Sequence, residues 1–418
     1  MRIAFVLLYF PSLSETFILN QIVGLIERGH EVDIYASYPE SDGSTKIHNL
    51  VEKYHLIEKT YYRPKWKNPK IYAILKGLIL LLGNLARDPI VLLRSLNPFE
   101  YGKEALSMRL LYGAIPVIKK QPYDIIHCHF AMMGVNGVLL REIGALKGKI
   151  ITSFHGADVN SHPKLYGENF YKPLFQKGDW FTSNTKFTAE IATKLGCPAE
   201  KISVLPVGLD MSSYSFEPRS LNPNEPVKII TVARLVEKKG IEYAIAAVAK
   251  VVKTYPNIIY KIVGEGHLRE PLEKLIAELG VAEKVHLLGW MTQDEVRQLY
   301  ADSQIFILSS VTAANGDKEG QGLVLQEAQA MGLPVLSTFH NGIPDGVLDG
   351  ESGFLVPEKD ADALAEKLTY LIENSQIVPK MGRAGRKFVE ERYDINKLND
   401  RLVEIYENLL AQSKPSTE

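Results

Sequence analysis

Two glutamates lie eight residues apart around a glycine-rich turn, in the run Glu319-Gly320-Gln321-Gly322-Leu323-Val324-Leu325-Gln326-Glu327. If Leu323 opens a helix, Glu319 lies in the loop before it and Glu327 in its second turn. The glycines let backbone approach a ligand closely, and the N–H groups at a helix start favour an anion. One carboxylate can then face the hydroxyls of a sugar while the other accepts hydrogen bonds from a ribose. The simpler alternative is two solvated glutamates beside a glycine turn, and isolated carboxylates favour it.

A basic cluster could supply the charge that such an anion needs. Arg234, Lys238 and Lys239 follow the first predicted strand of the second half of the chain. A guanidinium fork and an ammonium group at the carboxyl end of a sheet suit a diphosphate, although a solvated cluster would have the same sequence. The nearby Gly264-Glu265-Gly266 follows a strand, but Arg269 occupies the third glycine position of the dinucleotide fingerprint. This glycine pair alone is therefore weak evidence for a nucleotide.

Histidines lie at two predicted strand ends in the first half. His155 follows the strand Lys149–Phe154, and the residue type alone does not separate a structural role from contact with a ligand. His127 and His129 flank Cys128, and strand spacing puts both on one face. Because no third ligand is evident nearby, no metal site is predicted. For His129 a structural role is the simpler interpretation, and contact with an acceptor is the alternative.

The elements that would position these groups are strands and helices in alternation. Short β-rich runs alternate with helical periods, and the alternation is interrupted by a polar stretch with three prolines at 211–226. This pattern predicts an α/β fold of two tandem, doubly wound Rossmann-like domains facing each other across a cleft. The predicted parts are an N-terminal acceptor-side domain (1–210), a linker (211–226), a C-terminal donor domain (227–392) and a final helix that crosses back (393–418).

Together these motifs resemble glycosyltransferase family four over nearly the whole chain. The resemblance rests on ordered motifs at Ala233–Gly240, Val263–Gly266, Glu319 with Glu327, and Asn341–Pro344 followed by Asp349–Pro357. It implies a retaining, metal-independent, sugar-nucleotide-dependent enzyme of the GT-B type. Three further stretches are similar to the exopolysaccharide, colanic-acid-type branch, which implies bacterial surface polysaccharide synthesis: Ser14–Phe17, Phe154–Asp158 and Val311–Gly320.

The resemblance implies a donor site in the second domain. Arg234 and Lys239 would neutralise the donor diphosphate, with Lys238 assisting. Glu327 would hold the ribose hydroxyls, and Glu319 would contact the hydroxyls of the donor sugar. The other implied donor contacts cradle the sugar or lie against the nucleotide and its base, and they come from Gly322, Leu323, Gly264, Trp290 and Met291.

In the first domain, the resemblance implies that His155 reaches the donor sugar near its anomeric centre. Asp158 and His129 are candidates for contact with the acceptor. Many family members have a Gly-Gly loop after the first strand that faces the diphosphate, but here residues 11–16 contain no glycine. The predicted substitutes are the hydroxyls of Ser14 and Thr16 together with the N–H groups of the helix start.

The predicted reaction is transfer of a hexose, with retention, from UDP-glucose or UDP-galactose to a saccharide or lipid-linked saccharide acceptor. A well-stabilised diphosphate lets the reaction proceed on the front face of the donor without a covalent nucleophile, so Glu319 is interpreted as a positioning residue. No metal and no cofactor are expected. The alternatives are a sugar-nucleotide epimerase, a phosphorylase of the same two-domain type, and a non-catalytic two-domain ligand-binding protein, against which the lack of an export signal argues.

Composition narrows the class of partner and the compartment. The 48 Lys and Arg residues balance 49 Asp and Glu residues to a net charge of −1, which disfavours nucleic acid as a partner. Cys128 and Cys197 are too few for a disulfide framework, so a reducing cytoplasmic setting fits best.

A basic segment followed by an apolar one has two interpretations. Residues 61–70 hold four positive charges and no negative ones, and residues 71–82 are apolar apart from Lys76. No stretch is long enough for a spanning helix. A buried helix pair with a solvated basic loop is the simpler interpretation of residues 61–82, since amphipathic stretches more often face a core. Peripheral contact with the cytoplasmic face of the inner membrane is the alternative.

Overall fold

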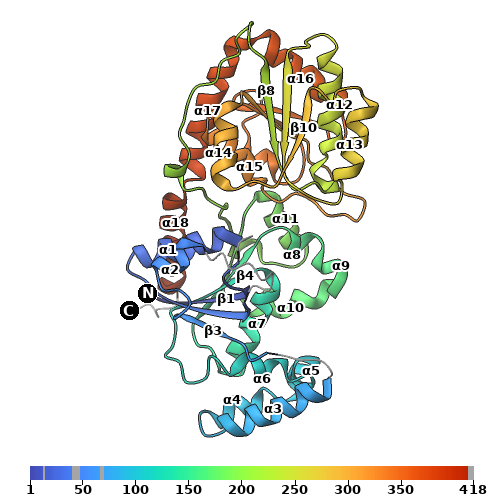
Figure 1. Ribbon diagram of the computed structural model, residues 1–418. Coiled ribbons are helices and arrows are strands. Elements are labelled where there is room, and N and C mark those ends of the chain that lie inside the picture. The colour runs from blue at the N-terminus through green and yellow to red at the C-terminus, as the bar shows by residue number, and fades with distance from the viewer. Residues whose placement is uncertain (13–14, 40–47, 66–69, 413–418) are drawn as a thin grey trace. The chain divides into compact units, whose positions relative to one another are not determined.

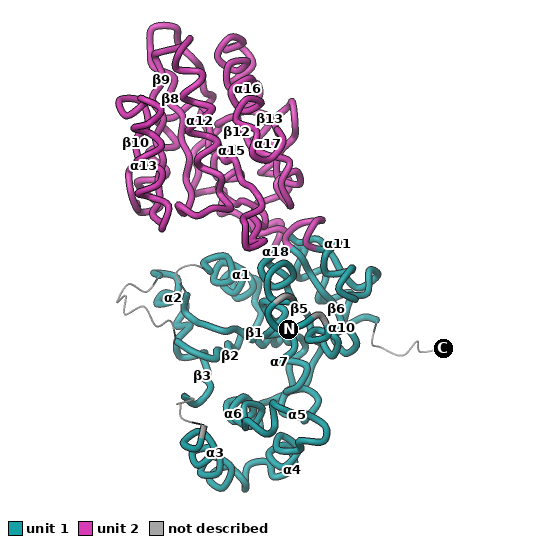
Figure 2. The backbone as a smooth tube through the Cα atoms, turned by 90° about the vertical axis from the view of Figure 1, so that its right-hand side faces the viewer, with its two compact units in different colours: residues 1–183, 189–205, 399–418 teal, residues 184–188, 206–398 magenta. Residues whose placement is uncertain are grey.

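The chain folds into two compact units in the computed structural model, which describes residues 1–12, 15–39, 48–65 and 70–412 (Figure 1). Unit 1 comprises Met1–Ser183, Ala189–Leu205 and the chain from Asn399 onward. Unit 2 comprises Asn184–Thr188 and Pro206–Leu398, as the two colours of Figure 2 show. Each unit is built on its own sheet and is described by itself.

Unit 1 is built on a seven-stranded sheet in which every pair of neighbouring strands is parallel. The strand order is β3-β2-β1-β4-β5-β6-β7, so the winding reverses between β1 and β4. All five residues of β4 are buried, His127 and His129 included, as expected for a central strand of a parallel sheet that is covered on both faces. The strands are β1 (Arg2–Tyr9), β2 (Glu31–Tyr38), β3 (Thr60–Tyr62), β4 (Ile125–His129), β5 (Lys149–Phe154), β6 (Trp180–Ser183) and β7 (Ile202–Val204).

Helices connect these strands and form an additional layer between β3 and β4. That layer, at the lower end of Figure 1, packs on α7 through α6 and consists of α3 (Lys70–Asn84), α4 (Pro89–Arg94), α5 (Pro98–Leu106) and α6 (Arg109–Ala114). The other helices are α1 (Thr16–Glu27), α2 (Asn49–Lys53), α7 (Ala131–Glu142), α8 (Ala157–Asn160), α9 (His162–Tyr166), η2 (Glu168–Tyr171), α10 (Lys172–Lys177), α11 (Lys186–Lys194) and η3 (Ala199–Lys201).

Unit 2 repeats the architecture with a six-stranded parallel sheet of order β10-β9-β8-β11-β12-β13. Its strands are β8 (Val227–Val232), β9 (Ile258–Val263), β10 (Val285–Gly289), β11 (Ile305–Leu308), β12 (Val335–Thr338) and β13 (Gly353–Val356). Its helices are η4 (Met211–Ser213), η5 (Glu237–Lys239), α12 (Ile241–Val252), α13 (Arg269–Glu278), α14 (Gln293–Asp302), α15 (Leu323–Ala330), η6 (Ile343–Gly346), α16 (Ala361–Glu373), η7 (Ser375–Ile377) and α17 (Val378–Arg392).

The last helix, α18 (Ile395–Ala411), contributes most of its length to unit 1. Asp400 forms an ion pair with Arg28 at 2.7 Å, and the Tyr406 hydroxyl lies 2.6 Å from Nδ1 of His127. A Cβ added to Gly24 of α1 would lie 1.9 Å from the Asn399 side chain, so a larger residue at position 24 would have to displace that side chain. The C-terminal helix therefore completes the core of unit 1.

The predicted α/β fold with two doubly wound Rossmann-like domains is confirmed. The domain boundary differs from the expected linker at 211–226, because these residues are counted to unit 2, which begins again at Pro206. Arg219 is buried and donates to the Met331 carbonyl at 3.0 Å, and Tyr214 accepts from Arg386 at 2.6 Å. The polar, proline-bearing composition thus reflects an irregular segment that is packed on the domain. Among the described residues, no helix is both long and apolar enough to cross a membrane.

Candidate active site

Close backbone contacts hold the loop after β8. A Cβ on Gly264, at φ +136°, would lie 1.9 Å from the Ala233 carbonyl oxygen, and one on Gly266 would lie 2.2 Å from that of Leu235. Hydrogen bonds of 2.9 Å from Ala233 N–H to the Val263 carbonyl and from Leu235 N–H to that of Glu265 close the same contact. The glycine pair thus lets two loops touch, which is the simpler of its two interpretations.

The Arg234 side chain extends into solvent from this loop after β8. Its side chain is exposed, and within the described part of the chain it has no hydrogen-bond or ion-pair partner. Leu235 beside it is fully buried, so the backbone is fixed while the guanidinium stays available. An unpaired guanidinium on an anchored loop is suited to binding an oxyanion in a bidentate manner.

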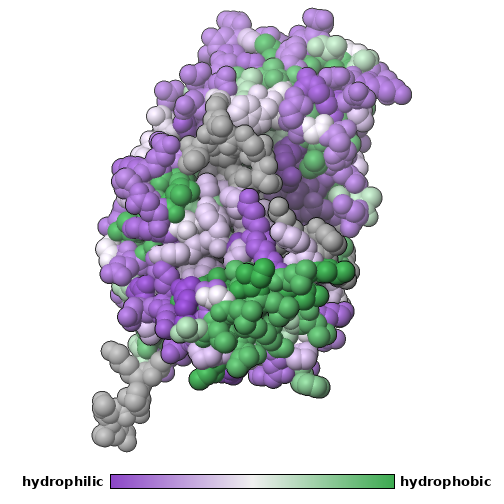
Figure 3. Space-filling model, turned by 60° about the horizontal axis from the view of Figure 1, so that its bottom comes forward, coloured by the Kyte–Doolittle hydropathy of each residue, from purple (hydrophilic) through white to green (hydrophobic). Residues whose placement is uncertain are grey.

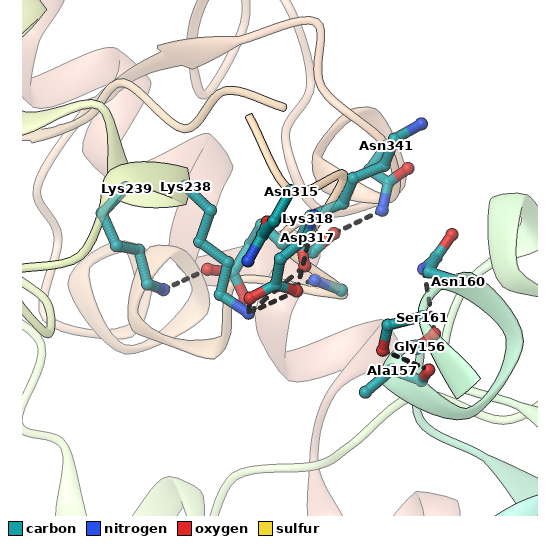
Figure 4. A network of polar contacts seen from close by, with 12 residues as sticks. Gly156, Ala157, Asn160, Ser161, Lys238, Lys239, Asn315, Asp317, Lys318 and Asn341 are labelled. Carbon is teal, nitrogen blue, oxygen red and sulfur yellow. Dashed lines mark hydrogen bonds and ion pairs between the residues drawn. The ribbon is translucent and has the colours of Figure 1, made fainter. Parts of the chain in front are cut away.

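Lys238 and Lys239 join the glutamate motif in one charged cluster (Figure 4). The Lys239 ammonium forms an ion pair with Glu319, and only 11% and 13% of the two side chains is exposed. Lys238 forms an ion pair with Asp317 at 3.1 Å and donates to the Lys318 carbonyl at 3.3 Å. The sequence predicted these lysines and Glu319 as separate motifs, and the structure brings them into contact.

The pairing decides the charge of Glu319. Burial alone would raise the pKa of this carboxyl, but the charge and hydrogen bond of Lys239, with help from Lys238, lower its pKa to about 2. Glu319 is therefore a carboxylate at neutral pH. It can accept hydrogen bonds from sugar hydroxyls, but it has no proton to donate as a general acid.

The backbone of Glu319 is held by residues for which the sequence predicted no role. Its N–H donates to Nε2 of His340 at 3.0 Å, which places the ring proton on Nδ1, 2.6 Å from the Glu358 carboxylate. The Asn341 amide donates to the Glu319 carbonyl at 2.5 Å. Both His340 and Asn341 follow β12, so their place directly after a buried strand was the available signal.

Glu327 is buried by its neighbours in the second turn of α15. The Tyr300 hydroxyl donates to its carboxylate at 3.2 Å, and Tyr214 also hydrogen-bonds to it. Burial raises the pKa of Glu327 despite these hydrogen bonds. Gly322, at φ +70°, ends the turn and Leu323 begins the helix, as the sequence predicts. Glu319 and Glu327 are thus not the two solvated glutamates of the simpler alternative.

The residues predicted to read the base lie directly after β10. The Trp290 ring is 73% exposed, whereas Met291 packs partly against the core of unit 2. Gly264 N–H donates to the Gly289 carbonyl at 2.8 Å, so the end of β10 lies beside the Gly264 turn. The structure brings Gly264 and the Trp290 segment together within unit 2.

In unit 1, three histidines stack at the carboxyl ends of β4 and β5. The rings of His127 and His129 are 4.5 Å apart, and those of His129 and His155 are 5.2 Å apart. Nδ1 of His129 lies 3.0 Å from Nε2 of His155. His127 continues the network to the Tyr406 hydroxyl at 2.6 Å and to Ser153 at 2.7 Å. The sequence predicted His155 and His129 as candidates but not the network that orients them.

Burial keeps these histidines neutral. Desolvation lowers the pKa of His127 and of His155 to about 3 and that of His129 well below its usual value. A neutral imidazole near a sugar can donate or accept one hydrogen bond, but it does not carry a charge at physiological pH. His155 is thus suited to orienting a hydroxyl.

The structure gives Asp158 a supporting role in place of the predicted contact with an acceptor. Its side chain has no exposed surface, and its carboxylate accepts from the N–H groups of Ala131, His155 and Gly156 at 3.0 to 3.1 Å. Burial raises its pKa to about 6. Asp158 therefore fixes the loop that carries His155.

The glycine-free loop before α1 is described only in part. Ser14 lies outside the described residues. Thr16 is the first residue of α1, and Glu15 precedes it at the N-cap position. Within the described residues, no three His, Cys, Asp or Glu side chains gather as a set of metal ligands.

Family models match both parts of the chain. Residues 14–213 match the model described as Glycosyltransferase Family 4, and residues 215–388 match the model described as Glycosyl transferases group 1. The boundary between the two matches falls beside the boundary between the two units.

Similar proteins and structures agree with these matches. The protein named colanic acid biosynthesis glycosyltransferase WcaL of Escherichia coli K12 is 36% identical over 98% of this chain and 100% of its own. The amylovoran biosynthesis glycosyltransferase AmsK of Erwinia amylovora is 35% identical over the same shares. The crystal structure of HepE from Anabaena with UDP is 18% identical at a TM-score of 0.70 and covers 98% of this chain and 100% of that one. These matches establish that the chain belongs to glycosyltransferase family four and has the GT-B fold.

Proposed function

We propose that this chain transfers a hexose, with retention, from a UDP-sugar, UDP-glucose or UDP-galactose, to a saccharide or lipid-linked saccharide acceptor. The observation that carries the proposal is the charged cluster of unit 2. The exposed Arg234 lies on the same loop as Lys238 and Lys239, and Lys239 forms an ion pair with Glu319. Anabaena HepE, a structure of the same fold, has been crystallised with UDP and with UDP-glucose.

The cluster would act on the leaving group. Arg234 and Lys239 would neutralise the charge that develops on the diphosphate, which is where preorganised charge accelerates group transfer most. Glu327 would accept hydrogen bonds from the ribose, and the backbone at Gly322 and Leu323 would cradle the sugar. With the leaving group assisted in this way, the acceptor hydroxyl attacks the donor's front face and no covalent nucleophile is needed.

Glu319 and His155 would orient the sugar. A carboxylate with a pKa of about 2 accepts hydroxyl hydrogen bonds at every physiological pH. A neutral His155 near the anomeric centre would hold one further hydroxyl. We propose that the reaction uses no metal and no cofactor, because Arg234, Lys238 and Lys239 supply the positive charge that the diphosphate needs.

The acceptor side of the proposal rests on the relatives. Both full-length relatives described above are named for the biosynthesis of an exopolysaccharide, colanic acid or amylovoran. We infer that this chain adds a hexose during synthesis of such a surface polysaccharide in the cytoplasm. A growing saccharide on a lipid carrier is the acceptor class that this role requires.

A panel of nucleotide sugars tests the donor. UDP-glucose, UDP-galactose, UDP-N-acetylglucosamine and GDP-mannose are each measured by calorimetric binding and by nucleoside diphosphate release. Tight binding and release confined to a UDP-hexose support the proposal, and preference for GDP-mannose overturns the choice of base. Conversion of the sugar nucleotide without any acceptor would indicate an epimerase, and binding without turnover under any acceptor condition would indicate a ligand-binding protein.

We also propose peripheral contact with the cytoplasmic face of the inner membrane. Figure 3 shows a broad hydrophobic area on the end of the molecule that carries the helices between β3 and β4. Phe99 is 99% exposed and Ile79 is 70% exposed. The other exposed apolar residues of this surface are Ile71, Tyr72, Ile74, Leu75, Leu78, Leu82, Leu85, Ile90, Leu93 and Leu106.

This surface extends the predicted contact beyond residues 61–82 to α4 and α5. Its residues belong to three consecutive helices, and within residues 61–109 the sequence holds nine Lys and Arg against three Asp and Glu. Apolar side chains flanked by basic ones suit an anionic bilayer surface. Monomeric soluble proteins rarely leave such a large apolar area exposed.

Vesicle sedimentation tests the membrane contact. The protein should sediment with vesicles that contain anionic phosphatidylglycerol, and a much smaller fraction of it should sediment with vesicles of pure phosphatidylcholine. Phe99→Asp and Ile79→Asp should each lower the bound fraction several-fold, whereas Leu279→Asp, at an exposed apolar position of unit 2, should not. Equal loss in all three variants, or no binding by the unaltered protein, contradicts the proposal.

A further inference from the structure

Unit 1 contains a cavity of about 420 Å³ that none of the predicted site residues lines. It lies where β1, β2 and β3 end, with Leu8, Tyr38 and Arg63 on the strand side and Asn136 of α7 opposite. A volume of this size is within the range of small-molecule sites.

The cavity shares an edge of the sheet with the histidine cluster. All seven strands of unit 1 run parallel, so the carboxyl ends of β1 and β2 lie on the same edge as those of β4 and β5. His129 and His155 follow that edge, and Met132, which also lines the cavity, is three residues beyond His129. In sheets of this type ligands bind along the carboxyl edge, and the cavity lies on the same edge of the unit 1 sheet as the histidine cluster.

Two guanidinium groups give the cavity a positive character. Arg63 hydrogen-bonds to the Tyr38 hydroxyl and lies 5.0 Å from the centre of that ring, but its Nε is buried with no partner among the described residues. A buried N–H without an acceptor is costly unless a ligand supplies one. Arg109 also lines the cavity, with its guanidinium 4.0 Å from the Glu104 carboxylate. Among the described lining residues two arginines thus accompany one carboxylate, and the Nε–H of Arg63 is the donor that an oxyanion would satisfy.

The opposite part of the cavity wall is aromatic. The rings of Tyr166 and Phe170 are 5.3 Å apart, and both line the cavity, where Tyr166 remains 51% exposed. Flat aromatic faces pack well against the apolar face of a sugar ring, while Asn136 and Glu104 offer an amide and a carboxylate to its hydroxyls. The lining thus combines groups that hold a sugar with groups that hold an anion.

We propose that this cavity binds an anionic saccharide as the acceptor. Arg63 and Arg109 hold its oxyanion, and Tyr166 and Phe170 hold an adjoining sugar ring. The oxyanion is either a phosphate, as at the linkage of a saccharide to a lipid carrier, or the carboxylate of an acidic sugar. The assignment rests on the proposed transferase activity, because it names the substrate that receives the hexose.

Saturation-transfer NMR on the full chain, with the donor site filled by excess UDP, tests the assignment. Three probes are compared: glucose 1-phosphate, the methyl glycoside of glucuronic acid, and the neutral methyl glucoside. At least one anionic probe should bind about ten-fold more tightly than the neutral one, as expected for one charge-assisted contact. A response to the phosphate only, or to the carboxylate only, identifies which oxyanion the cavity takes. Equal binding of all three probes, or no binding of any, overturns the proposal.

Variants locate the binding. Arg63→Gln and Arg109→Gln should each weaken the anionic probe about ten-fold, and Arg63→Lys, which keeps the charge, should weaken it less. Arg87→Gln, at an arginine of the same helical layer outside the cavity, is the matched control. Unchanged UDP affinity and melting temperature show that each variant is folded, and unchanged probe binding in Arg63→Gln overturns the assignment. The donor panel reports separately on the proposed activity: its failure with probe binding intact removes the acceptor role but not the site.

Discussion

The two sheets bury ionisable groups at their carboxyl ends in opposite ways. In unit 2, Lys239 and Glu319 keep their charges because each is the other's partner. In unit 1, His127, His129 and His155 lose their charge because desolvation lowers their pKa values. Burial of an ion requires either a partner or neutralisation, and the two units illustrate the two solutions.

The difference matches the chemistry that each unit would perform. A departing diphosphate carries charge, so a site with fixed positive groups suits it. A sugar and its acceptor are largely neutral at the reacting atoms, so oriented hydrogen bonds from neutral imidazoles are suited to hold them. The loss of activity or stability on disrupting the ion pair of unit 2 should therefore differ, in size and in dependence on pH, from the loss on disrupting the histidine cluster of unit 1.

The largest effect is expected from Lys239→Met. The variant leaves the buried Glu319 carboxylate without its main partner and removes a charge from the diphosphate, so kcat/KM for UDP release should fall about 10³-fold, equivalent to about 4 kcal/mol. Steady-state kinetics with the best donor of the panel measures this loss. Lys250→Met, which breaks the exposed pair with Asp362, is the control and should change little. Comparable losses in both variants would contradict a role of the buried Lys239–Glu319 pair in the reaction.

Arg234→Ala should have the next largest effect, and it should weaken the proposed diphosphate site without lowering the stability of the fold. Because the Arg234 side chain is exposed and unpaired among the described residues, its removal should leave the melting temperature unchanged. Donor affinity should fall about 100-fold, since a lost bidentate charged contact costs up to about 3 kcal/mol. Calorimetry with UDP measures the effect, and Arg234→Lys should recover only part of it. A variant with unaltered UDP affinity would refute the assignment of Arg234 to the diphosphate.

Sequence patterns predicted the fold and singled out the residues of the charged cluster in unit 2, but not the contacts between them. The apolar runs of β1 and β11 predicted buried parallel strands because such strands are apolar on both faces. The Glu319 and Glu327 spacing predicted a helix start at Leu323 because glycine precedes it, and the structure agrees. These features depend on local sequence, which is why the sequence alone indicates them.

Features that depend on distant contacts could not be predicted. Arg219 is buried because the Met331 carbonyl, far away in the sequence, accepts its hydrogen bond, so a polar segment that resembles a linker is packed on unit 2. The orientation of His127 depends on Tyr406 in the last helix. The cavity beside Arg63 and Arg109 is lined by residues from Leu8 to Phe170. Because these residues are far apart along the chain, no short sequence motif marks the cavity.

Acidification should destabilise unit 1 more than unit 2. His127 and His155 have folded pKa values of about 3, below the value of about 6.5 expected when unfolded, so their contribution to stability is present above pH 6.5 and is lost as the pH falls. Asp158 has the opposite sign, because its raised pKa of about 6 favours the folded state as it takes up a proton. Between pH 7 and 5.5 the losses from His127 and His155, less the gain from Asp158, should together lower the free energy of unfolding of unit 1 by about 2 kcal/mol.

Unit 2 should not follow unit 1 over that range. The lowered pKa of Glu319, about 2, contributes stability that is lost only as the pH falls below the ordinary glutamate range. Hydrogen exchange in peptides of β4 and β5 should therefore accelerate between pH 7 and 5.5, after correction for intrinsic rates, while peptides of β8 and β11 stay protected. His127→Gln removes one titrating group and should reduce the acceleration. Equal acceleration in both units would contradict the contrast between paired and neutralised groups.

The smallest effect is expected from Trp290→Ala, which tests the edge of the charged site. The ring is 73% exposed, so its loss should not destabilise unit 2. If it stacks on the base, its removal should raise the KM for the donor about five-fold, or about 1 kcal/mol, without changing kcat, because stacking is equal in the ground and transition states. Trp290→Phe keeps a smaller ring and should recover most of the affinity. A change in kcat, or a KM effect as large as that of Arg234→Ala, would show that Trp290 acts on the diphosphate and not on the base.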